Sequence, residues 1–189
     1  MIGSIEQPQQ IMLILMAGLA GVGKTTLAYN LGRELGYPVY DKDYMKDSFL
    51  KWGFSNKDAG WYAFDMWLDI TKDTLIKQKI SVILDSSALH PFIFAQAKEF
   101  AYLANAQLKI IHCHVENDIR LERLKMRETR PSQQNVIATA YDDDAQSFSH
   151  LPRELTYHLD TIVPPEQCVL KAMAYLRAET PQYIASGAT

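Results

Sequence analysis

A glycine-rich segment near the start of the chain has the residue types and the spacing of a phosphate-binding loop. Residues 18–26 read Gly-Leu-Ala-Gly-Val-Gly-Lys-Thr-Thr, which fits GxxxxGK[ST] without a gap. The glycines let successive main-chain N–H groups face one anion, and the start of a following helix adds partial positive charge. Lys24 then reaches the β- and γ-phosphates, and the Thr25 hydroxyl ligates Mg²⁺. The motif predicts a polyphosphate site made by Gly18, Ala20, Gly21, Val22, Gly23, Lys24, Thr25 and Thr26.

Three aspartates follow apolar stretches further along the chain and could act on the same phosphates. Asp41 and Asp43 come at the end of a short extended stretch, and Asp85 follows Val-Ile-Leu. A carboxylate near Mg²⁺ can hold a water ligand, and one that faces an alcohol can accept its proton as the oxygen attacks phosphorus. For each aspartate the competing interpretation is a cap on the following helix, and Asp85, beside two serines, is the most open to it.

Four arginines further along the chain are spaced by 3, 4 and 3 residues: Arg120, Arg123, Arg127 and Arg130. On a helix this spacing forms one stripe, which Pro131 ends because the residue before a proline avoids the helical conformation. The interleaved Glu122 and Glu128 would favour a solvated helix face if the stripe stood alone. Beside a polyphosphate site, guanidinium groups can instead stabilise charge on a transferring phosphoryl group or stack on a base.

These side chains need elements that bring them to one edge of a sheet. Apolar runs without alternation, typical of strands covered on both faces, occur at residues 11–16, 38–40, 81–84, 108–114 and 159–163. Helical patterns lie between them, at 27–35, 91–104 and 166–177, and in a stretch where Trp61, Phe64, Leu68 and Leu75 fall on one face. The β-α-β-α order predicts a parallel sheet with helices on both sides, and ligands beyond the carboxyl ends of its strands.

Composition narrows the class of protein. The 189 residues, 48% of them hydrophobic, suffice for one domain, predicted at residues 11–180 between a loose leader (1–10) and a tail (181–189). A net charge of −3 lacks the basic excess that would draw the chain to nucleic acid or an anionic membrane. The apolar run 11–22 is too short to span a bilayer, and nothing marks the chain for export, so a cytoplasmic location is expected. Cys113 and Cys168, without metal-ligand spacing, are expected to be buried thiols.

With the loop, the acidic pair and the arginines in this order, the sequence resembles the small P-loop kinases. The resemblance is strongest to AAA-type phosphotransferases grouped with zeta-toxin-like, gluconate-kinase-like and shikimate-kinase-like enzymes, and it extends from about residue 12 to 176. It implies a three-layer α/β P-loop NTPase fold with a five-stranded parallel sheet in the order 2-3-1-4-5 and helices on both faces. It further implies ATP and Mg²⁺ as cofactors, a helical segment covering the acceptor at about 44–78, and a lid at about 123–135.

The resemblance also implies roles for individual side chains. By the family's intervals, Asp43 is the base that takes the acceptor proton and Asp41 is the acid on the metal side, where Thr25 and Asp85 are also expected. Arg123 is expected to stack on adenine. The sequence Leu-Asp-Thr at 159–161, followed by two prolines at 164 and 165, is similar to the loop around adenine.

The lid arginines follow the same pattern. Arg130, which directly precedes Pro131 and lies seven positions after Arg123, is expected to close over the phosphates, with Arg127 assisting. One feature departs from the family: the glycine-rich substrate motif of shikimate kinases is absent after the third strand, where Asp85-Ser86-Ser87 stands. Shikimate is therefore not the expected acceptor.

The leading hypothesis is an ATP-dependent kinase that phosphorylates a hydroxyl of a small-molecule acceptor. A regulatory nucleotide-binding ATPase is the alternative, and a toxin-like kinase acting on an activated sugar shares the same chemistry. A GTPase switch is disfavoured because no guanine-reading NKxD occurs late in the chain. The aromatic segment 44–67 either packs in the core or lines an acceptor pocket, with Trp52 and Trp61 as the first rings to test.

Overall fold

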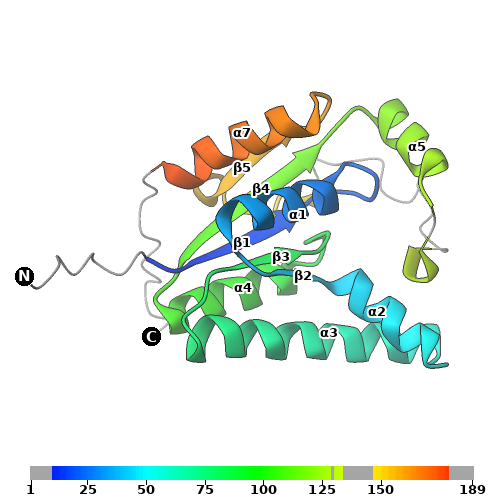
Figure 1. Cartoon of the computed structure of the whole chain (residues 1–189), viewed down its shortest axis with the longest axis horizontal. Coiled ribbons are helices and arrows are strands. Elements are labelled where there is room, and N and C mark those ends of the chain that lie inside the picture. Colours follow the sequence, from blue (N-terminus) through cyan, green and yellow to red (C-terminus); the bar gives the residue numbers. More distant parts are fainter. Residues whose placement is uncertain (1–9, 129, 134–146, 179–189) are drawn as a thin grey trace, which may run out of the picture.

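Five parallel strands form the central sheet of the molecule (Figure 1). The computed structural model describes residues 10–128, 130–133 and 147–178. The strands pair in the order β2-β3-β1-β4-β5, which confirms the expected topology. Their bounds are β1 (Met12–Ala17), β2 (Val39–Asp41), β3 (Val82–Asp85), β4 (Gln107–His114) and β5 (Thr156–Asp160).

Helices cover both faces of this sheet and also crowd its carboxyl edge. In Figure 1, α1 (Lys24–Leu35) and α7 (Pro165–Arg177) lie on one side, and α3 (Asn56–Lys72) and α4 (Pro91–Ala104) on the other. A π-helical turn, η1 (Asp73–Lys77), extends α3. Beyond the carboxyl ends of the strands lie α2 (Lys42–Lys51), α5 (Asn117–Met126) and the 3-10 turn η2 (Pro131–Gln133), while η4 (Arg153–Leu155) leads into β5. No helix in the described ranges is long and apolar enough to cross a membrane.

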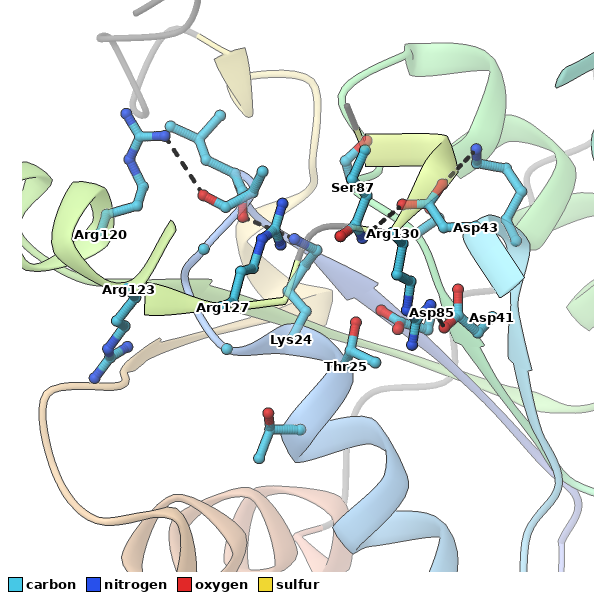
Figure 2. Close-up of a pocket in the computed structure, with 18 of the residues that line it drawn as sticks. Lys24, Thr25, Asp41, Asp43, Asp85, Ser87, Arg120, Arg123, Arg127 and Arg130 are labelled. Carbon is cyan, nitrogen blue, oxygen red and sulfur yellow. Dashed lines mark hydrogen bonds and ion pairs between the residues drawn. The ribbon is translucent and has the colours of Figure 1, made fainter. Parts of the chain in front are cut away.

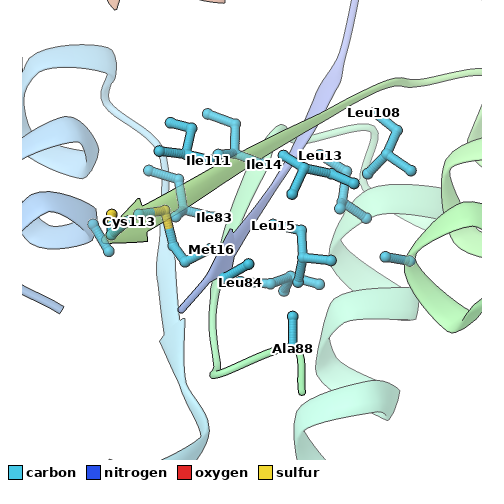
Figure 3. Close-up of a cluster of buried hydrophobic side chains, with 14 of the residues drawn as sticks. Leu13, Ile14, Leu15, Met16, Ile83, Leu84, Ala88, Leu108, Ile111 and Cys113 are labelled. Carbon is cyan, nitrogen blue, oxygen red and sulfur yellow. The ribbon is translucent and has the colours of Figure 1, made fainter. Parts of the chain in front are cut away.

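The strands form the centre of the hydrophobic core. Leu13, Ile14, Leu15 and Met16 of β1 are fully buried and pack among residues of β3 and β4 (Figure 3). Helices on both faces exclude water from successive side chains, which explains why β1 and the first three residues of β3 are apolar without alternation. The two cysteines are buried and unpaired, as the sequence predicted.

Two boundaries predicted from the sequence are wrong, one at α5, the helix after β4, and one at β5. The arginine stripe does not lie on one helix, because α5 ends at Met126 and Arg127 is already extended. The chain leaves the helix axis there because Arg130 is held across the sheet edge by Asp41. The last strand begins at Thr156 rather than at residue 159, since β5 pairs with β4 from that residue on.

The predicted apolar face of α3 is confirmed in part, because Phe64 and Leu68 pack against the core and Leu75 is buried. Ala59, Ala63, Trp67 and Thr71, spaced by four residues, face the interior. Trp61, predicted to lie on the apolar face, is 61% exposed. The small alanines let α3 approach α2 closely, while the Trp67 indole donates to the Tyr40 carbonyl over 2.8 Å and fixes the helix against the edge strand β2. The predicted tail, all of the predicted leader except residue 10, and part of the predicted lid lie outside the described residues.

Candidate active site

The loop between β1 and α1 has the conformation that its glycines allow. Gly18 and Gly21 adopt φ values of 131° and 89°, which side chains rarely tolerate. A Cβ atom on Gly18 would come within 2.3 Å of the Cys113 carbonyl oxygen, and one on Gly21 within 2.9 Å of the Arg120 carbonyl oxygen. The loop therefore packs main chain against main chain, and α1 begins directly after it at Lys24. This geometry fits a cradle for an anion at a helix N-terminus.

Lys24 lies at the base of a cleft of about 540 Å³ (Figure 2). Its ammonium donates to the Leu19 carbonyl oxygen over 2.7 Å, within its own loop. Burial lowers the pKa of Lys24, and the nearby Asp85 carboxylate opposes that change. Three parts of the chain line the cleft: the loop with the start of α1, the residues at and after the ends of β2 and β3, and residues from 120 to 133. The lining residues are Leu19, Ala20, Gly21, Gly23, Lys24, Thr25, Thr26, Asp41, Lys42, Asp43, Asp85, Ser86, Ser87, Leu89, Arg120, Arg123, Arg127, Glu128, Arg130 and Gln133.

Asp85, the last residue of β3, lies opposite Asp41 in the register of β2 and β3. It is buried, and burial raises its pKa to about 6, although Lys24 and a hydrogen bond with Thr25 favour the ionised form. It does not cap the next helix, because α4 begins at Pro91 with His90 at its N-cap. The carboxylate is thus directed to the Lys24–Thr25 end of the cleft.

Asp41 has two partners in the described chain. One carboxylate oxygen, Oδ1, accepts from the Tyr44 amide over 3.0 Å and caps α2, as the competing interpretation of strand-end aspartates expected. The other oxygen, Oδ2, accepts from Arg130 Nη1 over 2.8 Å. Its metal-side role stays a prediction, and the geometry adds a second role as the anchor of Arg130.

Asp43 lies one residue into α2 and faces the cleft (Figure 2). Burial alone would raise its pKa, but the Lys42 ammonium at 3.1 Å, the Gln133 amide at 3.4 Å and the charge on Lys24 together hold the pKa below its usual value. The carboxylate is therefore ionised at neutral pH, as a proton acceptor must be.

The four arginines have separate surroundings. Arg120 is buried and donates to the Asn117 side chain and, over 3.4 Å, to the Ala20 carbonyl, so it supports the phosphate loop. Arg123 is held by the residue after β5, Thr161, through both of its terminal nitrogens. The other two guanidinium groups lie over the opposite part of the cleft, where Figure 2 shows Arg127 beside Lys24 and Arg130 beside Asp41.

Comparisons with known proteins agree with this fold and site. A family model described as an AAA domain matches residues 13–151, more than two thirds of the chain. The chain belongs to this AAA domain family. A deoxyadenosine kinase of Dictyostelium discoideum is 25% identical, covering 82% of this chain and 75% of that protein.

Solved structures of small kinases share the fold of this AAA domain. An inferred kinase from Chloroflexus aurantiacus superposes with a TM-score of 0.70 at 20% identity, over 89% of this chain and all of that one. A gluconokinase from Sinorhizobium meliloti gives 0.57 at 20% identity, over 89% and 93%. These matches confirm the resemblance to small P-loop kinases and the fold that it implies.

Part of the AAA domain's site was not predicted from the sequence. Asp47 is buried and accepts from the Ser132 amide over 2.7 Å, which docks η2 on α2. Gln133 lines the cleft and reaches Asp43. Asp43 and Asp47 are four residues apart and so share one face of α2, a spacing that could have indicated a surface for the lid.

The aromatic segment does not line this cleft. Of the rings from residues 44–67, none is among the described residues that line it. Four of these rings pack against one another, mostly edge to face, where α2 ends and α3 begins: Phe49, Trp52, Phe54 and Tyr62. Trp52 and Trp61 are mainly exposed, so the structure does not bring them to the proposed acceptor pocket.

The cleft suits Mg²⁺ held together with phosphates. Within residues 10–128, 130–133 and 147–178, no group of three or more His, Cys, Asp or Glu side chains could hold a metal ion. Mg²⁺ commonly takes only one or two protein ligands beside phosphates and water. The Thr25 hydroxyl and Asp85 carboxylate, already in contact, meet that need.

Proposed function

We propose that the chain transfers the γ-phosphoryl group of ATP to a hydroxyl group of a small-molecule acceptor. The observation that carries this proposal is one cleft in which the ionised Asp43 faces the phosphate loop and Lys24. A protein that only binds nucleotide has no need for a carboxylate on that side. A kinase needs one to hold and deprotonate its acceptor.

On the nucleotide side, the amides of residues 18–24 and the Lys24 ammonium bind the phosphates. Lys24 leaves the Leu19 carbonyl and turns to the β- and γ-phosphates, where its charge matches the charge that builds up during transfer. Arg123 packs on the adenine ring. When Mg²⁺ is bound, held by Thr25 and Asp85 with Asp41 beside them, it neutralises phosphate charge.

On the acceptor side, Asp43 accepts the hydroxyl proton as the oxygen attacks phosphorus. In the structure its Oδ2 is in contact with Gln133, so an acceptor hydroxyl replaces the Gln133 amide as the donor to this carboxylate. Arg127 and Arg130 reach the transferring group from the lid. Arg127 suits this role because its guanidinium makes no ion pair in the part of the chain that the structure describes.

The test is a panel of deoxynucleosides, sugars and other alcohols incubated with ATP and Mg²⁺, with phosphorylated products detected by mass. Deoxynucleosides come first because one relative is a deoxyadenosine kinase. Asp43→Asn should lower the rate of product formation by roughly 10²–10⁴, while Asp65→Asn, a change to an exposed aspartate of α3, should not change it. Consumption of ATP without any phosphorylated alcohol would favour the regulatory ATPase instead.

A further inference from the structure

Thr161, the first residue after β5, connects three parts of the nucleotide side. It is buried, and its hydroxyl lies 2.7 Å from the Val22 carbonyl oxygen in the phosphate loop and 3.1 Å from the His114 carbonyl oxygen at the end of β4. Arg123 donates to the same hydroxyl over 3.2 Å through Nη1 and to the Thr161 carbonyl over 2.8 Å through Nη2. A hydroxyl has one proton to donate, and the shorter contact assigns it to Val22.

This arrangement fixes Arg123 relative to the phosphate loop. A Cβ atom on Gly23 would lie 3.9 Å from Arg123 Nη1 and 4.0 Å from Thr161 Cβ, so the guanidinium lies directly beside the loop. A free arginine loses rotamer entropy when a ligand immobilises it. Here two hydrogen bonds already restrict the side chain, which reduces that cost on binding.

We propose that Thr161 is a positioning residue for the nucleotide, fixing the guanidinium that packs on the base at a set distance from the loop that holds the phosphates. The assignment rests on the proposed ATP site. Thr161 acts through Arg123, so its hydroxyl contributes to the binding of a nucleotide more than to the binding of a polyphosphate without a base.

The experiment compares two ligands, a nonhydrolysable ATP analogue and inorganic tripolyphosphate, by calorimetry with Mg²⁺. Thr161→Val keeps the side-chain shape but removes the hydroxyl, and should weaken analogue binding roughly tenfold while weakening tripolyphosphate binding less than about threefold. Thr161→Ser keeps the hydroxyl and should bind both ligands as the parental chain does. Thr156→Val is the matched control, because the Thr156 hydroxyl donates to the Pro152 carbonyl at the other end of β5.

Equal weakening of both ligands would overturn the assignment, since Thr161 would then merely support the loop. Parental affinity in Thr161→Val would overturn it too. In an Arg123→Ala background Thr161→Val should have no further effect on analogue binding, and additive losses would contradict the coupling. If Thr161→Val does not fold, Thr161→Ala, which leaves room for a water at the Val22 carbonyl, takes its place with the same expectations.

These measurements need neither an acceptor nor turnover. A chain that binds the analogue as described but phosphorylates no alcohol would therefore refute the proposed function and leave the role of Thr161 standing. If the parental chain phosphorylates an acceptor while Thr161→Val binds both ligands normally, the proposed function stands and the role of Thr161 is refuted.

Discussion

The two sides of the cleft are held in place by different forces. On the nucleotide side, main-chain packing sets the geometry: the Gly18 and Gly21 positions leave no space for a side chain, and the loop lies against the end of β4. On the acceptor side, side-chain contacts join residues 130–133 to the end of β2 and the start of α2, with Arg130 on Asp41 and Gln133 on Asp43. On the first side the packing sets the path of the main chain before a ligand arrives, whereas on the second side the geometry depends on side-chain contacts that a ligand can replace.

The largest effect on turnover is expected on the nucleotide side of the cleft. Lys24→Ala removes the charge that faces the γ-phosphate, so turnover should fall by roughly 10²–10⁴ while the fold survives. Steady-state kinetics with an acceptor from the panel measure this, with Lys57→Ala on the exposed start of α3 as the control. Parental turnover in a folded Lys24→Ala variant would refute the cradle.

Asp43→Asn tests the acceptor side of the cleft. The amide keeps the shape but cannot accept the proton, so transfer should fall by roughly 10²–10⁴ while affinity for the nonhydrolysable ATP analogue is retained. Calorimetry and kinetics on one preparation separate the two quantities. Weak Mg²⁺·ATP binding in both Asp41→Asn and Asp43→Asn would instead make this pair a metal site.

Arg130 and Arg123 are expected to act on different parts of the nucleotide, the transferring group and the base. Arg130→Ala is expected to lower kcat by roughly tenfold to a hundredfold with little change in KM for ATP, because one charge-assisted contact to the transferring group is lost. Arg123→Ala should raise KM for ATP and leave kcat nearly unchanged. Arg153→Ala, at an exposed position before β5, serves as the control. If both substitutions are silent, neither guanidinium acts on the nucleotide.

A smaller effect is expected on stability at Asp85. Because burial raises its pKa from 3.8 to about 6, the folded chain retains a proton that the unfolded chain releases between these values. The free energy of unfolding therefore falls as pH rises through that window and stays reduced above it. Asp85→Asn removes this loss and should raise the free energy of unfolding by about 1–3 kcal/mol at pH 7, with little difference below pH ~4.

Urea titrations of both proteins without Mg²⁺ at pH 4 and pH 7 measure the difference. The same variant should bind Mg²⁺·ATP more weakly. The Asp85 carboxylate would then favour ligand binding while it lowers the free energy of unfolding. An Asp85→Asn variant less stable than the parent at pH 7 would contradict the argument.

The smallest effect is expected at the exposed aromatic rings. Trp61→Ala and Trp52→Ala should change kcat/KM for the acceptor by less than about twofold, since neither ring lines the cleft. A saturable change in tryptophan fluorescence on acceptor binding that disappears in either variant would show that α2 and α3 rearrange to cover the acceptor.

Sequence predicted the nucleotide side better than the acceptor side for a physical reason. The glycines at 18, 21 and 23 and the lysine at the start of α1 belong to one short motif that can be read from neighbouring residues. The strand before this motif is a continuous apolar run, which is also a local pattern. The Asp47–Ser132 and Asp41–Arg130 contacts join residues 85 and 89 positions apart, and no local pattern encodes such pairs. The end of α5 was missed for the same reason, because a distant partner rather than Pro131 draws the chain off the helix.

The edge position of β2 has a consequence for local stability. The strand has three residues and, among the strands that the structure describes, pairs with β3 alone; it ends at Asp41, and Asp43 follows two residues later. Short edge strands open more readily than the strands beside them. A local opening of β2 would separate these aspartates from Asp85 while the rest of the sheet stays intact. Ligands that bridge the cleft would therefore slow hydrogen exchange at the β2 amides before they affect the amides of β1.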